Sequence, residues 1–234
     1  MTEEQKLRYS RLMAIEEIGR EGMERLREAT VLVAGCGALG SMVAMQLAAS
    51  GIGKLRIVDF DTIDLSNLQR QFFYTSSEAG EKKAISLASK IRALNPEVEV
   101  EIHDCMLNSG NAGDFVKGCD FVVEATDNHP SMLIIDRICE EASIPCVLAG
   151  VSGFSGQVMT CLPGHRRYRD VFPETETSGM LPCSITGVAG PAAAVAASIE
   201  VAEAIKSIIG LSPLLSDRLL LFDLLNLSFN VLEI

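Results

Sequence analysis

The sequence predicts an α/β fold, namely a doubly wound, mostly parallel sheet with helices on both faces and an antiparallel C-terminal extension. Two observations lead to this prediction. Between residues 29 and 151, apolar runs of strand length alternate with helical patterns, which is the order of strand–helix–strand units in a parallel sheet. After residue 151, strands and helices no longer alternate, which favours antiparallel pairing. We expect one domain over residues 1–234, since two would be cramped in a chain of 234 residues.

Residues 4–28 begin the chain with a helical pattern that Gly19 or Gly22 interrupts. Arg8 and Arg11 lie about one turn apart in this pattern, so they share one side of the first helix. Taken alone, two such arginines are typical of a solvated basic surface.

The next stretch has the layout of a Rossmann-like nucleotide site. An apolar run over residues 31–34 precedes residues 35–40 (GCGALG), which match the pattern GxGxxG, and a helical pattern follows over residues 42–50. A second apolar run, residues 55–58, ends in Asp59. Glycines let the backbone approach phosphate, the helix start offers unpaired N–H groups, and an acid at this position can accept bonds from ribose hydroxyls.

Polar residues then continue at the same end of the predicted sheet. Residues 61–71 (DTIDLSNLQRQ) include Asn67 and Arg70, whose side chains are suited to phosphate oxygens. We expect the aromatic residues 72–74 to hold this segment on the core, and a helix capped by Ser76 or Ser77 to run through Lys82 and Lys83 to about Leu94. Adjacent lysines cannot point the same way on a helix.

Two further strands are predicted, over residues 97–103 and 120–125. The second delivers Thr126, Asp127 and Asn128 to the edge of the sheet that holds the glycine loop. An acid there is placed to bind Mg²⁺ on phosphates, but a helix cap before His129 explains Asp127 equally well, and the two roles are compatible.

The C-terminal part predicts strands over residues 145–151, 157–162, 219–223 and 227–234, and a long helix over residues 187–209. The helix is rich in alanine and is suited either to core packing or to a homodimer interface. Between them, residues 163–184 form a long loop without periodicity, of a kind that is usually functional or disordered. Its basic run, residues 165–169 (HRRYR), is interpreted as a solvated loop, with guidance of an acidic partner as the alternative.

Taken together, these motifs resemble the ubiquitin-activating-enzyme-like adenylyltransferases of the ThiF/MoeB/HesA type. The matching segments occur in the family's order and span nearly the whole chain: residues 8–11 (RYSR), 35–40, 59–61 (DFD), 66–71 (SNLQRQ), 80–83 (GEKK) and 125–128 (ATDN). The resemblance implies ATP-dependent adenylylation of the C-terminal glycine of a small ubiquitin-like sulfur-carrier protein. It also implies a nucleotide-binding half over residues 29–151 and a carrier-binding and dimerisation half over residues 152–234, which follow N-terminal helices over residues 1–28.

The resemblance also assigns roles to individual residues. It places Arg70, Lys83 and Asp127 at the catalytic centre, with Mg²⁺ on Asp127, and Arg11 across a homodimer interface on the partner's ATP. Cys183 is the candidate for sulfur transfer, with a packed thiol as the alternative. The nucleotide-binding set is Gly35, Gly37, Ala38, Gly40, Asp59, Asp61, Ser66, Asn67, Arg70, Lys83, Asp127 and Asn128.

Composition limits the other classes. The net charge of −11 tells against general binding of nucleic acid or anionic membranes, and the charged N-terminus predicts no signal peptide, so we expect a cytoplasmic protein. Relatives that bind zinc use two CxxC pairs, but this sequence has none, so no zinc is expected. A sulfur donor of the desulfurase or rhodanese type is a further expected partner. The alternative function is activation of a small or tRNA-borne carboxylate, as in dehydratase-like relatives, while a dehydrogenase would leave Arg70 and Lys83 without a role.

Overall fold

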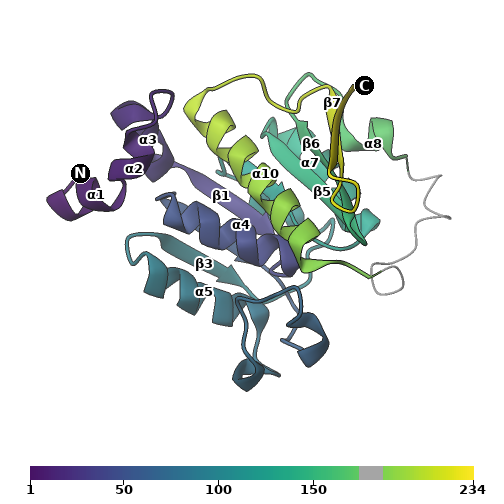
Figure 1. Ribbon diagram of the computed structural model, residues 1–234, viewed down its shortest axis with the longest axis horizontal. Coiled ribbons are helices and arrows are strands. Elements are labelled where there is room, and N and C mark those ends of the chain that lie inside the picture. Colours follow the sequence, from purple (N-terminus) through teal and green to yellow (C-terminus); the bar gives the residue numbers. More distant parts are fainter. Residues whose placement is uncertain (174–186) are drawn as a thin grey trace.

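The computed structural model describes residues 1–173 and 187–234, which form one eight-stranded sheet covered by helices (Figure 1). The strand order is β3-β2-β1-β4-β5-β6-β7-β8. The strands are β1 Thr30–Ala34, β2 Lys54–Val58, β3 Glu99–His103, β4 Phe121–Glu124, β5 Cys146–Ser152, β6 Ser155–Cys161, β7 Arg218–Asp223 and β8 Ser228–Glu233. Strands β1 to β5 pair in parallel and β5 to β8 pair antiparallel, which confirms the predicted fold class.

Helices cover the two faces of the sheet unequally. One face packs against α3 (Gly19–Glu28), α4 (Ala38–Ala49), α5 (Lys83–Leu94) and α10 (Gly190–Ile209). The other face packs against α6 (Ala112–Val116), α7 (His129–Ala142) and α8 (Tyr168–Val171). Because β1 and β4 are buried on both faces, they read as nearly continuous apolar runs in the sequence.

The long helix α10 lies beside α4 across the front of the sheet in Figure 1. Its contact surface is made of small residues, and Ala192, Ala193, Ala196 and Ala197 are all fully buried. The alanines therefore serve core packing within this chain. No helix in the described ranges is both long enough and apolar enough to cross a membrane.

The N-terminal segment forms α1 (Glu3–Arg8), α2 (Ser10–Met13) and α3 instead of one interrupted helix. It packs at the end of the sheet where α4 and α5 finish. Arg8 donates from Nη1 to the carbonyl of Leu94 at 3.0 Å, and the Tyr9 ring covers Gly51, just beyond the end of α4. The break before α3 falls at Gly19, one of the two predicted positions, where φ is +54°.

The helix expected to start at Ser76 or Ser77 begins only at Lys83, so that prediction was wrong. Residues Ser76–Glu78 form a separate 3₁₀ turn, which Thr75 caps. Gly80 then turns the chain with φ +90°, and its N–H donates to the carbonyl of Ile63. The segment between β2 and α5, residues 59–82, is therefore folded, and it contains a second 3₁₀ turn at Leu65–Asn67. We call residues 59–82 the excursion.

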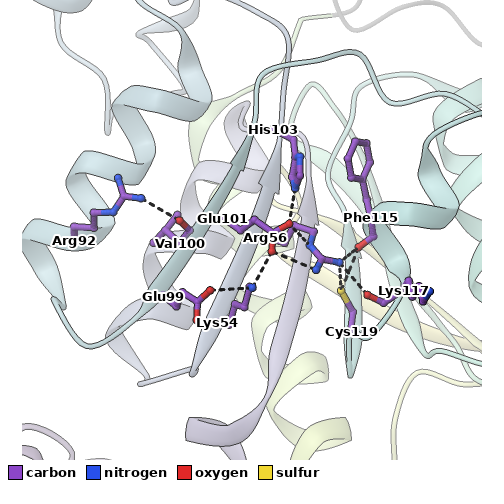
Figure 2. Close-up of polar contacts among 10 residues, drawn as sticks. All are labelled: Lys54, Arg56, Arg92, Glu99, Val100, Glu101, His103, Phe115, Lys117 and Cys119. Carbon is purple, nitrogen blue, oxygen red and sulfur yellow. Dashed lines mark hydrogen bonds and ion pairs between the residues drawn. The ribbon is translucent and has the colours of Figure 1, made fainter.

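A cluster of charged side chains lies on β2 and β3, at the outer edge of the parallel part of the sheet (Figure 2). Arg56, in the middle of β2, pairs with Glu101 of β3 through Nε at 3.0 Å and also donates to the carbonyls of Phe115 and Lys117 at the end of α6. Bonds from Lys54 and Arg56 hold the pKa of the Glu101 carboxyl at about 2. The cluster explains how an arginine is accommodated in an otherwise apolar strand.

Candidate active site

The glycine loop between β1 and α4 contains glycines of two kinds. Gly35 has φ +97°, and a Cβ on it would lie 2.6 Å from the carbonyl oxygen of Ala125. A Cβ on Gly40 would lie 1.9 Å from the carbonyl oxygen of Gly35. The fold therefore requires these two glycines. A Cβ on Gly37 would meet only the amide nitrogen of Gln71 within 4 Å, at 3.5 Å, so a side chain would fit there.

Gly37 is the N-cap residue of α4 and precedes Ala38, the first residue of that helix. The N–H groups of a first helical turn have no partner within the helix, and the helix dipole favours an anion there. A glycine that the fold does not require, placed at such a helix start, lets a phosphate group approach the backbone closely. The donors of this loop thus fit the phosphates of a nucleotide.

Asp59 connects the end of β2 to the glycine loop. Its carboxylate accepts from the N–H of Cys36 at 2.6 Å and from the N–H of Asp61 at 2.7 Å. Burial raises the pKa of the Asp59 carboxyl, although these two bonds act in the opposite direction. Each carboxylate oxygen has a second lone pair, so the arrangement fixes Asp59 while leaving acceptor capacity for ribose hydroxyls.

Lys83 lies at the first position of α5 and is 5 % exposed. Its Nζ lies 2.9 Å from Oδ2 of Asp61, and its backbone N–H donates to the carbonyl of Asp61 at 3.1 Å. The neighbouring Lys82 points elsewhere, because its Nζ contacts the carbonyl of Phe60 and Oδ1 of Asp104. The two lysines therefore diverge as expected, and Lys83 is the one connected to the nucleotide loop through Asp61 and Asp59.

The excursion folds back onto the glycine loop. The hydroxyl of Tyr74, which is buried, donates to the carbonyl of Cys36 at 2.7 Å, and Phe73 packs against the core, so two of the three aromatic residues hold the segment in place, while Phe72 stays exposed. Arg70 donates from Nη1 to the carbonyl of Ser66 at 3.2 Å. Its backbone lies against the start of α10, where a Cβ on Gly190 would lie 3.5 Å from the Arg70 Cα.

The loop after β4 separates the two roles that the sequence left open for Asp127. The side chain that caps α7 belongs to Asn128, whose Oδ1 accepts from the N–H of Ser131 at 3.0 Å. Asp127 is exposed. Behind it, the N–H of Thr126 donates to the buried Glu124 at 3.1 Å, and burial raises the pKa of the Glu124 carboxyl to about 7. Because Ala125 touches Gly35, Asp127 lies at the edge of the sheet that holds the glycine loop.

Two predicted residues lie away from this site. Arg11 is exposed on α2, beside the C-terminal ends of α4 and α5. Since α4 starts at the glycine loop and has 12 residues, about 18 Å of helix separates these ends from the nucleotide loop of the same chain. Cys183 lies outside the described residues. The remaining predicted residues are brought to one edge of the sheet.

The basic run over residues 165–169 is solvated only at His165 and Arg166, so the interpretation as a solvated loop was wrong for Arg167 and Tyr168, which are buried. Arg167 is 3 % exposed and donates from Nε to Asp136 of α7 at 2.9 Å. Arg169 also binds Asp136, at 2.9 Å, and His165 binds Asp217 at 2.7 Å. Residues 1–173 and 187–234 contain no group of three or more His, Cys, Asp or Glu that could hold a metal ion. Ion pairs order the described start of the loop.

The fold and site define a class: an α/β protein whose glycine loop and helix start fit the phosphates of a nucleotide, with a buried lysine beside them. Comparison with known protein families identifies the family within this class. The ThiF family model matches residues 9–234, so the chain belongs to the ThiF family.

The chain is 38 % identical over 223 residues to the SAMP-activating enzyme E1 of Haloferax volcanii, covering 95 % of this chain and 83 % of the relative. It is 38 % identical over 240 residues to the sulfur carrier protein adenylyltransferase of Thermus thermophilus, covering 100 % and 89 %. Among solved structures, E. coli MccB with ATP has a TM-score of 0.82 at 25 % identity, covering 97 % of this chain and 71 % of that one.

Sequence reasoning missed one residue at this site. Gln71 ends the segment SNLQRQ and was given no role, yet it is buried against Gly37. The available signal was its type: a polar amide within a segment already interpreted as binding phosphate. Its burial was not readable, because it depends on how the excursion folds back onto the glycine loop.

Proposed function

We propose that this chain adenylylates the C-terminal glycine carboxylate of a small ubiquitin-like sulfur-carrier protein, using ATP and releasing pyrophosphate. The observation that carries the proposal is the glycine loop with its unobstructed Gly37, connected through Asp59 and Asp61 to the buried Lys83. The relatives named above support the carrier as substrate. A further relative, from Porphyra purpurea, is named a probable molybdopterin-synthase adenylyltransferase and is 38 % identical over 234 residues.

The proposed chemistry brings two anions together. A carboxylate oxygen of the carrier attacks the α-phosphorus of ATP, the bond to the β-phosphate oxygen breaks, and pyrophosphate leaves with that electron pair. No general base is needed, because the carboxylate is already ionised at neutral pH. Lys83 and Arg70 offset the negative charge that would otherwise oppose the attack, and the start of α4 holds the phosphates in position. When bound, Mg²⁺ on Asp127 would add charge compensation on the phosphates.

The carrier needs a docking surface next to the site, and the turn between β7 and β8 has suitable properties. Leu225 is 73 % exposed and Leu227 is 79 % exposed. Leu227 also has φ +52°, a conformation that is strained for a bulky side chain. The N–H of Leu224 donates to the carbonyl of Phe154, close to the end of β5, so this apolar turn lies at the nucleotide edge of the sheet. We assign it to carrier docking.

The same proposal includes a homodimer. Arg11 is exposed about 18 Å of helix away from its own glycine loop, so it can serve an ATP site only in a second chain. The exposed Leu7, on the neighbouring helix α1, is consistent with an interface there. In this arrangement Arg11 of one chain contacts the phosphates bound by its partner.

A later sulfur-transfer step belongs to the same proposal. Cys183 would act after adenylylation, with a sulfur donor of the desulfurase or rhodanese type, in thiamine, molybdopterin or tRNA thiolation. Because the carrier carboxylate rather than a thiol attacks ATP, Cys183→Ala should leave pyrophosphate exchange intact.

The test is ATP–pyrophosphate exchange with each candidate carrier from the same genome. Exchange should require a carrier with its C-terminal glycine and should vanish when that residue is deleted. Exchange that depends instead on a small carboxylate or on tRNA would replace the proposed substrate. Tight NAD binding without ATP affinity would overturn the adenylylation chemistry itself.

A further inference from the structure

Gln71 is a buried polar residue whose hydrogen bonding is incomplete. The residue is 4 % exposed. Within the described part of the chain, its Oε1 has no hydrogen-bond partner and no exposed surface. A buried amide oxygen without a donor destabilises a fold, and most such groups in proteins are satisfied. The residue is therefore either a defect of packing or a group kept there for a ligand.

The surroundings favour a ligand. The nearby Tyr74 is also buried and polar, but its hydroxyl is bonded to the glycine loop at 2.7 Å. The excursion is thus able to satisfy a buried polar group on this surface, and it does so three residues from Gln71. Of the two, only Gln71 has a buried polar atom without any hydrogen-bond partner.

A second, independent observation falls at the same place. A Cβ on Gly37, the glycine that the fold does not require, would have one atom within 4 Å, and that atom is the amide Nε2 of Gln71. Gly37 caps α4 and marks where a phosphate can approach the helix start. The side chain of Gln71 therefore borders the space that the absence of a Cβ leaves open.

We propose that Gln71 binds the triphosphate of the nucleotide, with its amide nitrogen donating to a phosphate oxygen above Gly37. The proposal rests on the proposed function and adds to it a phosphate-binding side chain. It explains why an amide is buried here although its carbonyl oxygen has no partner: the unpaired oxygen is the cost of keeping the amide donor beside Gly37.

The prediction separates ligand binding from packing. Gln71→Met keeps the length of the side chain but removes both hydrogen-bonding groups. In the absence of nucleotide it should unfold at the same temperature as the wild type or at a higher one, because an unpaired buried group is gone. It should nevertheless bind Mg·ATP at least about tenfold more weakly, which corresponds to about 1.4 kcal/mol.

The experiment combines calorimetric titration with Mg·ATP and thermal unfolding without nucleotide, for the wild type, Gln71→Met, Gln71→Glu and Gln69→Met. Gln71→Glu keeps the shape but replaces the donor with an oxygen, so it should also bind ATP more weakly, and it decides the question if Gln71→Met does not fold. Gln69→Met is the matched control, since Gln69 lies in the same segment and is exposed; its affinity should equal that of the wild type.

Three outcomes would overturn the proposal. If both Gln71 variants bind Mg·ATP like the wild type, Gln71 only packs, while the proposed function stands. If their affinity falls only together with their unfolding temperature, Gln71 is structural. If the wild type itself binds no ATP, the proposed function fails first, and the role of Gln71 fails with it.

Discussion

The two halves of the sheet present different kinds of group at the edge that holds the glycine loop. In the parallel half, a side chain would fit at Gly37, and the Gln71 carbonyl oxygen has no partner in the described structure. Polar groups are thus left without partners at one edge of the sheet. In the antiparallel half, Arg167 and His165 are paired with Asp136 and Asp217, while leucines of the last turn are exposed. Unpaired polar groups suit a small anion, whereas exposed apolar groups suit a protein. This difference supports the proposal that the parallel half binds the nucleotide and the antiparallel half binds a protein.

The largest effect is expected at the lysine of the parallel half. Lys83→Ala should reduce carrier-dependent pyrophosphate exchange by more than about 100-fold, because a preorganised positive charge is lost from a covered site. Lys82→Ala is the matched control, since the Lys82 side chain contacts Phe60 and Asp104 outside the site. Its exchange rate should stay near that of the wild type. Equal losses in both variants would show that the two lysines are not distinguished in the way their contacts indicate.

The ion pairs of the antiparallel half should matter for stability and not through a metal. Arg167→Ala leaves Asp136, which is fully buried, with the partly exposed Arg169 as its cation and the backbone N–H of Tyr168 as a further donor, and should cost about 3 kcal/mol of unfolding free energy. Arg166→Ala, which keeps the backbone bond of Arg166 to Asp217, should cost little. Thermal unfolding with and without EDTA completes the measurement. A large drop in melting temperature on chelation would mean that a metal orders the loop after all.

The N-terminal helices belong to neither half of the sheet, and mixing two inactive chains tests where they act. Arg11→Ala and Lys83→Ala homodimers should both be inactive. In a mixed dimer one of the two sites keeps both side chains, so random mixing should restore about a quarter of the wild-type exchange rate. Mixed dimers that form but show no rescue would place Arg11 outside the partner's site.

How far sequence alone predicted this molecule depends on how local each feature is. The strand predicted over residues 31–34 is β1, Thr30–Ala34, because a buried parallel strand is a continuous apolar run. The glycine loop and Asp59 were predicted together, because their spacing along the chain sets their geometry. The pairing of Arg167 with Asp136 was missed, since it joins residues 31 positions apart. The burial of Gln71 depends in the same way on how the excursion folds.

A smaller effect is expected at the turn between β7 and β8, which is proposed to bind the carrier. Leu227→Asn should weaken carrier binding by about tenfold, since a Leu that docks in a pocket contributes more than about 1 kcal/mol. The same change relieves strain, because Asn tolerates the positive φ of 52° at this position, so the melting temperature should not fall. ATP affinity should be unchanged. Leu94→Asn, on an exposed leucine at the opposite end of the sheet, is the control for replacing a surface leucine by an amide. Unchanged carrier affinity would remove the turn from the docking surface.

The last effect depends on pH and concerns a buried acid of the antiparallel half. Glu200 of α10 is fully buried, and within the described residues neither carboxylate oxygen has a hydrogen-bond partner. Burial raises the pKa of this carboxyl well above its ordinary value of 4.5. The folded protein therefore holds a proton that the unfolded chain releases above pH 4.5. It follows that stability falls as pH rises from that value toward the folded pKa, by about 1.4 kcal/mol per pH unit at most.

Glu200→Gln removes the titration while keeping the shape of the side chain. Compared with this variant, the wild type should lose unfolding free energy steadily between about pH 5 and pH 7, as measured by urea denaturation. Glu141→Gln, on an exposed glutamate of α7, should follow the wild-type curve. If Glu200→Gln and the wild type instead run parallel across this range, Glu200 is paired after all, and the antiparallel half has no unpaired buried acid. If they diverge, Glu200 is buried without a partner, and its cost to stability depends on pH because its charge does.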